Sequence, residues 1–302
     1  MNWSDIGDAM FGGMADYGAI LALVSNSVIA GAVLGLVGGL VGVFVMQRDM
    51  AFAVHGISEL SFAGAAFALL IGWDVVTGSI VGSLIAAGLI GWLGARARDR
   101  NSFIGVLMPF GLGLGILFLS LYSGRSANRF SLLTGQIVSV QNAQLGWLIA
   151  ISILVLLGLL FIWRPLRFDS LDPQSAAARG VPVTAVSLGF MLLLGLIVAV
   201  AIHIIGALLV MALLVTPAAA AMRIASGPWS VPLLAAGFGF VSAVGGILLA
   251  IAGTLPVSPY ITTISFLIYL VCRLVGGRRG RVLLGLLRLF LGILLVCFGP
   301  RS

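Results

Sequence analysis

One histidine and one glutamate, His55 and Glu59, stand four positions apart within the apolar stretch 51–73, AFAVHGISELSFAGAAFALLIGW. Four residues is just over one turn of an α-helix, so both side chains fall on the same helix face. Glu59 is the only glutamate in the chain. A carboxylate inside a membrane is costly unless it has a partner or faces water. The imidazole and carboxylate together suit a borderline divalent cation such as Zn²⁺, Mn²⁺ or Fe²⁺, and we interpret the pair as part of a cation path.

Two other interpretations of the pair stay open on these residues alone. His55 and Glu59 could be a hydrogen-bonded polar pair that only holds helices together, or Glu59 could relay protons. The second histidine, His203, stands near the outer end of a later apolar stretch. It is either an interfacial histidine without a function or part of an outer vestibule.

The composition places these residues in a membrane protein. Of the 302 residues, 61% are hydrophobic and only 8% are charged, and the mean hydropathy is +1.22. A soluble domain could not solvate such a surface. At about 20 residues for each membrane-spanning helix, the chain has room for roughly nine or ten spans. The 41 glycines are typical of helices that pack closely in lipid.

The charged residues exclude two classes of function. The net charge of +7 comes entirely from arginines set against nine acidic residues, because the chain contains no lysine. The arginines stand singly or in small groups between apolar runs, which indicates membrane topology rather than nucleic-acid binding. A Walker A loop needs its lysine on the nucleotide phosphates, so this chain is not itself a P-loop ATPase.

The apolar runs predict an all-α polytopic membrane protein with about nine spans. We divide the chain into an extracytoplasmic segment (1–16), a transmembrane domain (17–276) and a basic and apolar tail (277–302), of which 282–298 lies in the interface or makes one more span. The polar interval 123–144 contains SLLTGQIVSV, which is too short to span. The expected spans are 17–46, 51–73, 75–94, 103–122, 145–163, 183–202, 205–222, 228–253 and 261–275.

The arginines also predict the orientation. Loops that follow even-numbered spans carry Asp74, Arg125, Arg129 and His203. Because cytoplasmic loops are rich in arginine and lysine, the loops after odd-numbered spans should be cytoplasmic, with the N-terminus outside and the C-terminus inside. Those loops hold Arg48, then Arg96, Arg98 and Arg100, then Arg164, Arg167 and Arg179, then Arg223, and finally Arg273, Arg278, Arg279 and Arg281.

The longest polar connection, 164–182, contains a predicted short helix. Asp172 and Pro173 form a helix start, with proline in the first turn, and Gly180 follows the expected end. The segment is either a simple capped loop helix or a cytoplasmic surface against which another protein pushes.

Several segments resemble the membrane permeases of the ABC-3 family over about residues 20–276. They are GLVGGLVGVFVMQRDMAF at the end of the first span, SELSFAGAAFALL in the second, SLLTGQIVSV as an outer loop, FDSLDPQSAAARGV as a cytoplasmic coupling segment, and IIGALLVMALLVTPAAAAMRI before the last two spans.

The resemblance implies the ABC-3 importer permease fold in a bacterial plasma membrane. It implies import of zinc or manganese, with iron as a further candidate, with ATP hydrolysed by separate cytoplasmic subunits and the ion delivered by an extracytoplasmic binding protein. Two copies would line the path, and the chain would have no enzyme activity, no permanently bound cofactor and no nucleic-acid partner. Asp172, Pro173, Ala177 and Gly180 would then contact the ATPase.

The pair in the second span departs from the family pattern. Metal importers of this family commonly carry an aspartate there, followed four residues later by a histidine, and both face the path. Aligned through Gly64, those positions fall on His55 and Glu59. The carboxylate and imidazole are therefore present in swapped order, and the resemblance implies that they contact the passing metal ion.

Two alternative functions belong to other classes. An ion-coupled secondary transporter or channel could use Glu59 as its cation or proton site, although a capped cytoplasmic helix favours the importer. An intramembrane enzyme lacks support, because the sequence has neither an HExxH nor a GxSxG motif.

Overall fold

The computed structural model describes residues 24–93, 97–123, 137, 140–251 and 257–276, and these are helical apart from short connections. This confirms the all-α fold class. The helices are α3 (Ser25–Gln47), α4 (Ala51–Ile71), α5 (Val75–Leu93), α6 (Ala97–Leu121), α8 (Asn142–Leu171), α9 (Pro173–Ala178), α10 (Val183–Ile205), α11 (Ala207–Ile224), α12 (Ser230–Ile251) and α13 (Val257–Gly276).

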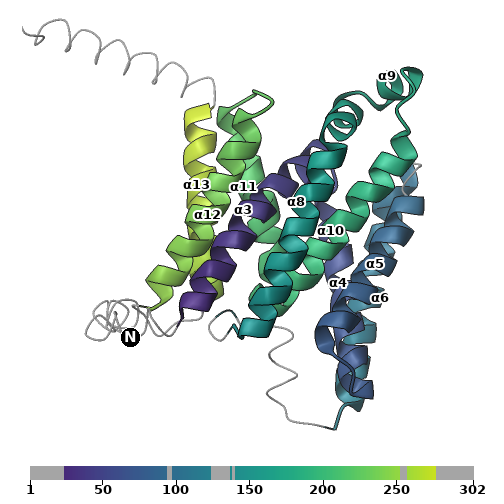
Figure 1. Cartoon of the computed structure of the whole chain (residues 1–302), viewed down its shortest axis with the longest axis vertical. Helices are drawn as coiled ribbons and strands as arrows, with labels where there is room; N and C mark the ends of the chain where they lie inside the picture. Colours follow the sequence, from purple (N-terminus) through teal and green to yellow (C-terminus); the bar gives the residue numbers. More distant parts are fainter. Residues whose placement is uncertain (1–23, 94–96, 124–136, 138–139, 252–256, 277–302) are drawn as a thin grey trace, which may run out of the picture.

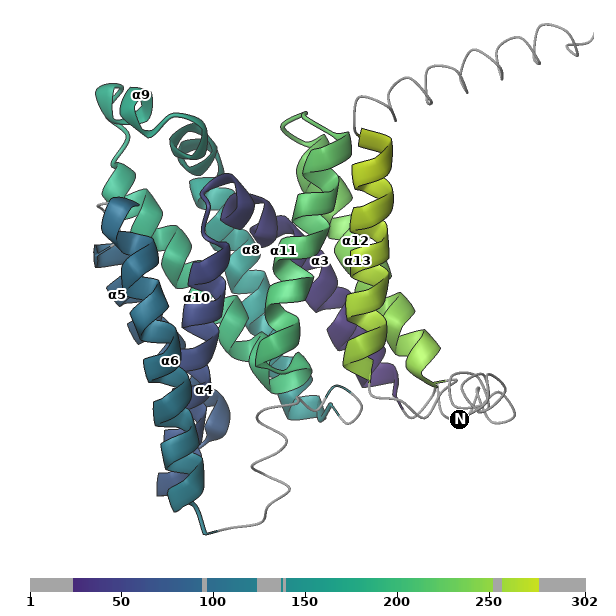
Figure 2. The ribbon, with the colours of Figure 1, turned by 180° about the vertical axis from the view of Figure 1, so that it is seen from behind.

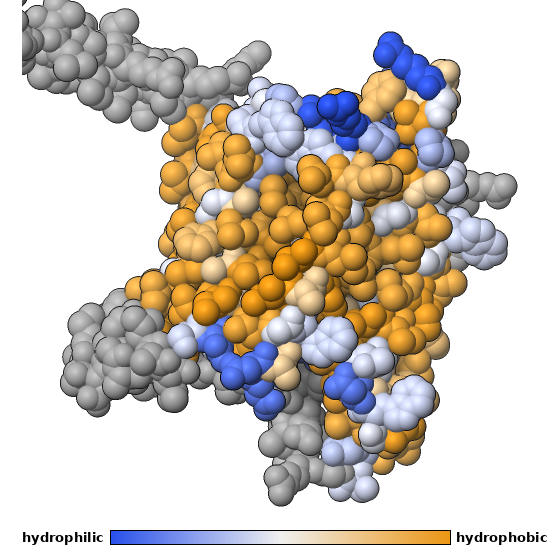
Figure 3. Space-filling view, viewed as in Figure 1, coloured by the Kyte–Doolittle hydropathy of each residue, from blue (hydrophilic) through white to orange (hydrophobic). Residues whose placement is uncertain are grey.

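Eight helices of the described part are long and apolar enough to cross a membrane, and α11 adds a shorter apolar helix over Leu209–Ile224. Together they match the predicted nine spans. Many large apolar side chains point outward, and Figure 3 shows an apolar band between two more polar ends of the molecule. Side chains arranged in this way face lipid rather than water, so the chain is a multi-pass membrane protein.

The helices form two groups joined at the middle of the molecule (Figures 1 and 2). In one group α3, α11, α12 and α13 pack together, and in the other α4 packs against α5 and α6 while α10 packs against α5. Helix α8 lies against both α10 and α3 and so connects the groups. Helix α4, with the candidate pair, also contacts α10 and α11, which places it on the inner side of its group.

Glycines let some of these helices approach closely. A Cβ on Gly35 of α3 would collide with the carbonyl of Gly239 in α12, and a Cβ on Gly64 of α4 would collide with the carbonyl of Gly78 in α5. Small residues at helix crossings bring the backbones into contact, which is a main source of helix association in lipid. Gly64 therefore helps to set the position of α4.

One end of the bundle carries the α3–α4 turn, α9, the α11–α12 loop and the end of α13 (Figures 1 and 2). These are loops that the arginine pattern assigned to one side of the membrane. The structure thus agrees with the prediction that the loops after odd-numbered spans lie on one side of the membrane. Which of the two sides is cytoplasmic stays a prediction.

Two helix ends differ from expectation. Helix α8 does not end at Arg164 but continues through Pro165 to Leu171. A proline removes one backbone hydrogen bond, yet the helix persists because the residues beyond it pack against the bundle. Helix α10 continues past His203, and the reversal occurs at Gly206, whose φ of +79° favours glycine.

Other predictions fall outside the described residues. They concern the N-terminal segment 1–16, most of the interval 123–144 and the tail 277–302.

Candidate functional site

Helix α4 places His55 and Glu59 on one face, as the spacing predicted. His55 Nε2 lies 3.5 Å from Glu59 Oε1, and the two side chains are 25% and 8% exposed. The helix starts directly after the α3–α4 turn, so at 1.5 Å per residue His55 and Glu59 lie about 6 and 12 Å along it. The carboxylate therefore lies well inside the apolar band while the imidazole is nearer its edge.

The pair offers two donor atoms that can reach one cation. Donors 3.5 Å apart can both bind an ion at about 2.1 Å with an angle of roughly 110° between the two bonds. Among the described residues there is no group of three or more His, Cys, Asp and Glu side chains that could hold a metal ion. His55 and Glu59 therefore offer two donors of these types from this copy of the chain.

Other polar side chains of α4 make hydrogen bonds that are separate from the His55–Glu59 pair. The Ser58 hydroxyl donates to the Val54 carbonyl of the same helix at 2.8 Å. The Ser61 and Ser79 hydroxyls lie 2.6 Å apart, and together they fix α4 against α5. His55 Nδ1, in contrast, is buried and has no hydrogen-bond partner within the described part of the chain.

His203 lies in the last turn of α10 and is buried, with 8% of the residue exposed. Its Nε2 atom has no hydrogen-bond partner among the described residues. His203 lies near Asp74 and the backbone of Val75, beside the α4–α5 connection. In this conformation the side chain is enclosed, and its role in an outer vestibule stays a prediction.

Helix α9 has the predicted capped form. Asp172 Oδ1 accepts hydrogen bonds from the backbone amides of Gln174 and Ser175, each at 3.1 Å, and its Oδ2 accepts from the Ser175 hydroxyl at 2.5 Å. These bonds lower the pKa of the Asp172 carboxyl, with the Ser175 hydroxyl as the largest cause. The side-chain oxygen satisfies amides at the helix start that have no partner within the helix.

The end of α9 is equally well defined. Gly180 has a φ of +81°, in the region where glycine carries no steric penalty. Asp172, Pro173, Ala177 and Gly180 are all exposed, and only Ala176 is buried. The capped helix projects from the end of the bundle (Figure 2), where it is accessible to another protein.

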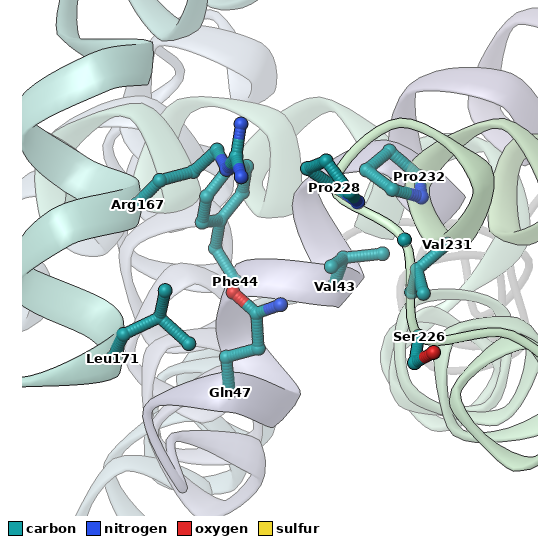
Figure 4. Close-up of a pocket in the computed structure, with 10 residues that line it drawn as sticks. Val43, Phe44, Gln47, Arg167, Leu171, Ser226, Pro228, Val231 and Pro232 are labelled. Carbon is teal, nitrogen blue, oxygen red and sulfur yellow. The ribbon is translucent and has the colours of Figure 1, made fainter.

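Two cavities are unsuited to a cation. One of about 120 Å³ lies between α3, the end of α8 and the α11–α12 loop (Figure 4). Its only charged lining residue is Arg167, whose guanidinium would repel a metal ion. Another of about 430 Å³ between α4, α5 and α6 is lined almost entirely by apolar side chains. Neither cavity is lined by His55 or Glu59.

The sequence reasoning missed a buried ion pair. Arg48, at the end of α3, pairs with Asp169 of α8, and the two side chains are 10% and 1% exposed. Arg48 Nη2 also donates to the Ser187 hydroxyl of α10 at 2.9 Å. Leu159, Leu166 and Asp169 are buried at helical spacing, so the inward face of α8 continues beyond Pro165.

Comparison with known proteins agrees with this architecture. The model of the ABC 3 transport family matches residues 21–276. The manganese transport system membrane protein MntC of Halalkalibacterium halodurans is 31% identical over 74% of this chain and 77% of its own length. The manganese import system permease protein ScaB of Streptococcus parasanguinis is 29% identical over 82% and 89% of the two chains.

A solved structure is also similar. PsaBC from Streptococcus pneumoniae, determined in complex with a Fab, contains a chain that is 27% identical with a TM-score of 0.77. The match covers 86% of this chain and 95% of that one. Because the family model covers most of the residues and a relative above 30% identity covers more than two thirds of them, the chain belongs to the ABC 3 transport family.

Proposed function

We propose that this chain is the membrane subunit of an ATP-driven importer of a divalent transition-metal ion, and that this ion is manganese. The observation that carries the proposal is the His55–Glu59 pair on α4. It is supported by the similarity of this chain to proteins named as a manganese transport system membrane protein and a manganese import system permease protein. Zinc and iron are the competing cargoes, because imidazole and carboxylate donors accept them as well.

In this function His55 and Glu59 would contact a partly dehydrated ion. Glu59 supplies negative charge inside the apolar band, where a cation would otherwise be strongly disfavoured, and His55 supplies a neutral nitrogen donor. Two donors bind weakly enough to let the ion leave, while a second copy of the chain could present the same pair from the other side of a shared path.

The remaining parts of the importer would be separate proteins. Cytoplasmic ATPase subunits would dock on α9 through Asp172, Pro173, Ala177 and Gly180, because that capped helix is exposed. An extracytoplasmic binding protein would deliver the ion at the opposite end of the bundle. In this arrangement the end that carries α9 would be cytoplasmic, in agreement with the orientation predicted from the arginines.

The test is uptake by a complex of this chain with its ATPase and binding protein, reconstituted in liposomes. Manganese uptake should depend on ATP, and manganese should compete better than equal concentrations of zinc or iron. Uptake of manganese without ATP would instead support an ion-coupled carrier or channel, and a clear preference for zinc would overturn the choice of metal.

A further inference from the structure

The Arg48–Asp169 ion pair joins the turn that leads into α4 to the end of α8 that leads into α9. Asp169 stands three residues before Asp172, the cap of α9, on the part of α8 that extends beyond Pro165. Arg48 follows the last residue of α3 and begins the short turn that leads into α4 at Ala51. The two side chains join segments that are 121 positions apart in the sequence.

Arg48 holds a third helix as well. Its Nη2 atom donates to the Ser187 hydroxyl of α10, and its guanidinium lies over the Phe190 ring at 5.9 Å from the ring centre. Helices α8 and α10 are the two that flank α9 in the chain. The start of α4 is therefore connected through one side chain to both supports of α9.

The turn between α3 and α4 has a restricted conformation. Asp49 has a φ of +52° and is the only non-glycine residue with positive φ in the part of the chain that the structure describes. Met50 is buried, and its backbone amide donates to the Val45 carbonyl at 2.8 Å. A short turn held in this way passes a displacement of Arg48 to Ala51 rather than absorbing it. Because α4 is a continuous helix, His55 and Glu59 would move with it.

We propose that Arg48 and Asp169 are positioning residues that transmit movement of α9 to the His55–Glu59 pair. The inference rests on the proposed function, in which ATPase subunits act on α9. A buried charge pair is suited to the task, because either charge alone would be left uncompensated in a low-dielectric site if the segments separated. The pair therefore keeps α8 and the α3–α4 turn moving as one body.

The test compares manganese uptake with ATP hydrolysis in the reconstituted complex. Asp169→Asn keeps the side-chain shape but removes the charge, and the number of ions imported for each ATP hydrolysed should fall about tenfold or more while hydrolysis continues. The exchange Arg48→Asp with Asp169→Arg should recover part of this ratio. Arg167→Gln is the matched control on the same segment, because Arg167 makes no hydrogen bond or ion pair with the described residues. In this variant the number of ions imported for each ATP hydrolysed should equal that of the wild type.

Three results would overturn the proposal. The first is an unchanged ratio in Asp169→Asn. The second is that Asp169→Asn loses ATP hydrolysis, manganese uptake and folded complex in parallel, and that the variant with Arg48→Asp and Asp169→Arg recovers none of them. That result would mean that the ion pair has a purely structural role. A wild-type complex that hydrolyses ATP without importing manganese overturns the proposed function as well, so the wild-type and variant measurements separate the two failures.

Discussion

Glu59 holds a carboxylate oxygen 3.5 Å from Nε2 of His55, and both groups project from one face of α4. Glu59 is buried among apolar helices, whereas His55 is partly exposed. A passing cation could thus meet the imidazole and the carboxylate in sequence or bind both together.

Replacing Glu59 with glutamine should reduce manganese uptake by roughly tenfold or more, since a charged donor in a low-dielectric site contributes much more than a neutral one. Insertion and thermal stability should be little changed, because the amide has nearly the same shape. Uptake is measured in the reconstituted complex. Ser58→Ala is the matched control, because that neighbouring buried hydroxyl bonds only to its own helix. Normal uptake by the Glu59 variant would remove the pair from the ion path.

Exchanging the two donors should preserve part of the function. The variant His55→Asp with Glu59→His gives the carboxylate-then-imidazole order that the family resemblance implies, and it keeps one donor of each kind. We expect more manganese uptake from it than from either single change, because both donors can still reach one ion. A metal-competition series with the same variant would show whether donor order affects selectivity. A double variant no better than the singles would mean that the two sites are not interchangeable.

Periodicity predicted most of the fold because the information is local. An apolar run long enough to span a bilayer identifies a helix, and four-residue spacing places His55 and Glu59 on one face without knowledge of their neighbours. Asp172, Pro173 and Gly180 likewise contain the signals for the start and end of α9 within a few residues.

The Arg48–Asp169 pair could not be found in the same way. Arg48 and Asp169 each lie beyond the end of an expected span, because the first of these spans ends at 46 and the fifth at 163. Only the tertiary packing of α3, α8 and α10 shows that α8 continues and that the two charges meet in a buried place. The burial of His203 also depends on contacts between distant segments, which spacing along the chain does not report.

Replacing Gly64 with alanine should displace α4 from α5, since the new methyl group would collide with the Gly78 carbonyl. Overpacking of this kind typically costs about 1–3 kcal/mol. We expect a lower temperature of inactivation in detergent and lower uptake. Gly88→Ala in α5 is the matched control, because its added Cβ would meet no atom within 4 Å. Equal behaviour of the two variants would argue against close packing of α4 on α5.

Replacing Gly180 with alanine should distort the exit from α9. Space is not the limitation, since a Cβ there would meet no atom within 4 Å, but the φ of +81° would place an L side chain in a strained region. The expected cost is roughly 1–2 kcal/mol. Gly180→Asn should be milder, because asparagine tolerates this region better. Affinity of the permease for its ATPase subunit provides the measurement, and an alanine variant that binds as tightly as the asparagine variant would contradict the prediction.

The Asp172 cap should make the start of α9 sensitive to acid. Because the folded-state pKa lies below its ordinary value of 3.8, the stabilisation by the charged carboxylate is complete above that ordinary value and is lost as the pH falls through the lower folded-state value. Asp172→Asn should cap the helix without this pH dependence, and Asp172→Ala should weaken the cap at every pH.

Ser175→Ala tests the cause of that lowered pKa. The hydroxyl of Ser175 is the largest contributor, so its removal should raise the pKa of Asp172 toward 3.8 while the backbone amides of Gln174 and Ser175 retain part of the effect. The measurement is a carbon NMR titration of labelled aspartate in nanodiscs, with the Asp172 signal identified by its absence from Asp172→Asn. An unchanged pKa in Ser175→Ala would show that the backbone amides alone hold the charge. Asp172 would then act on α9 only through the helix backbone.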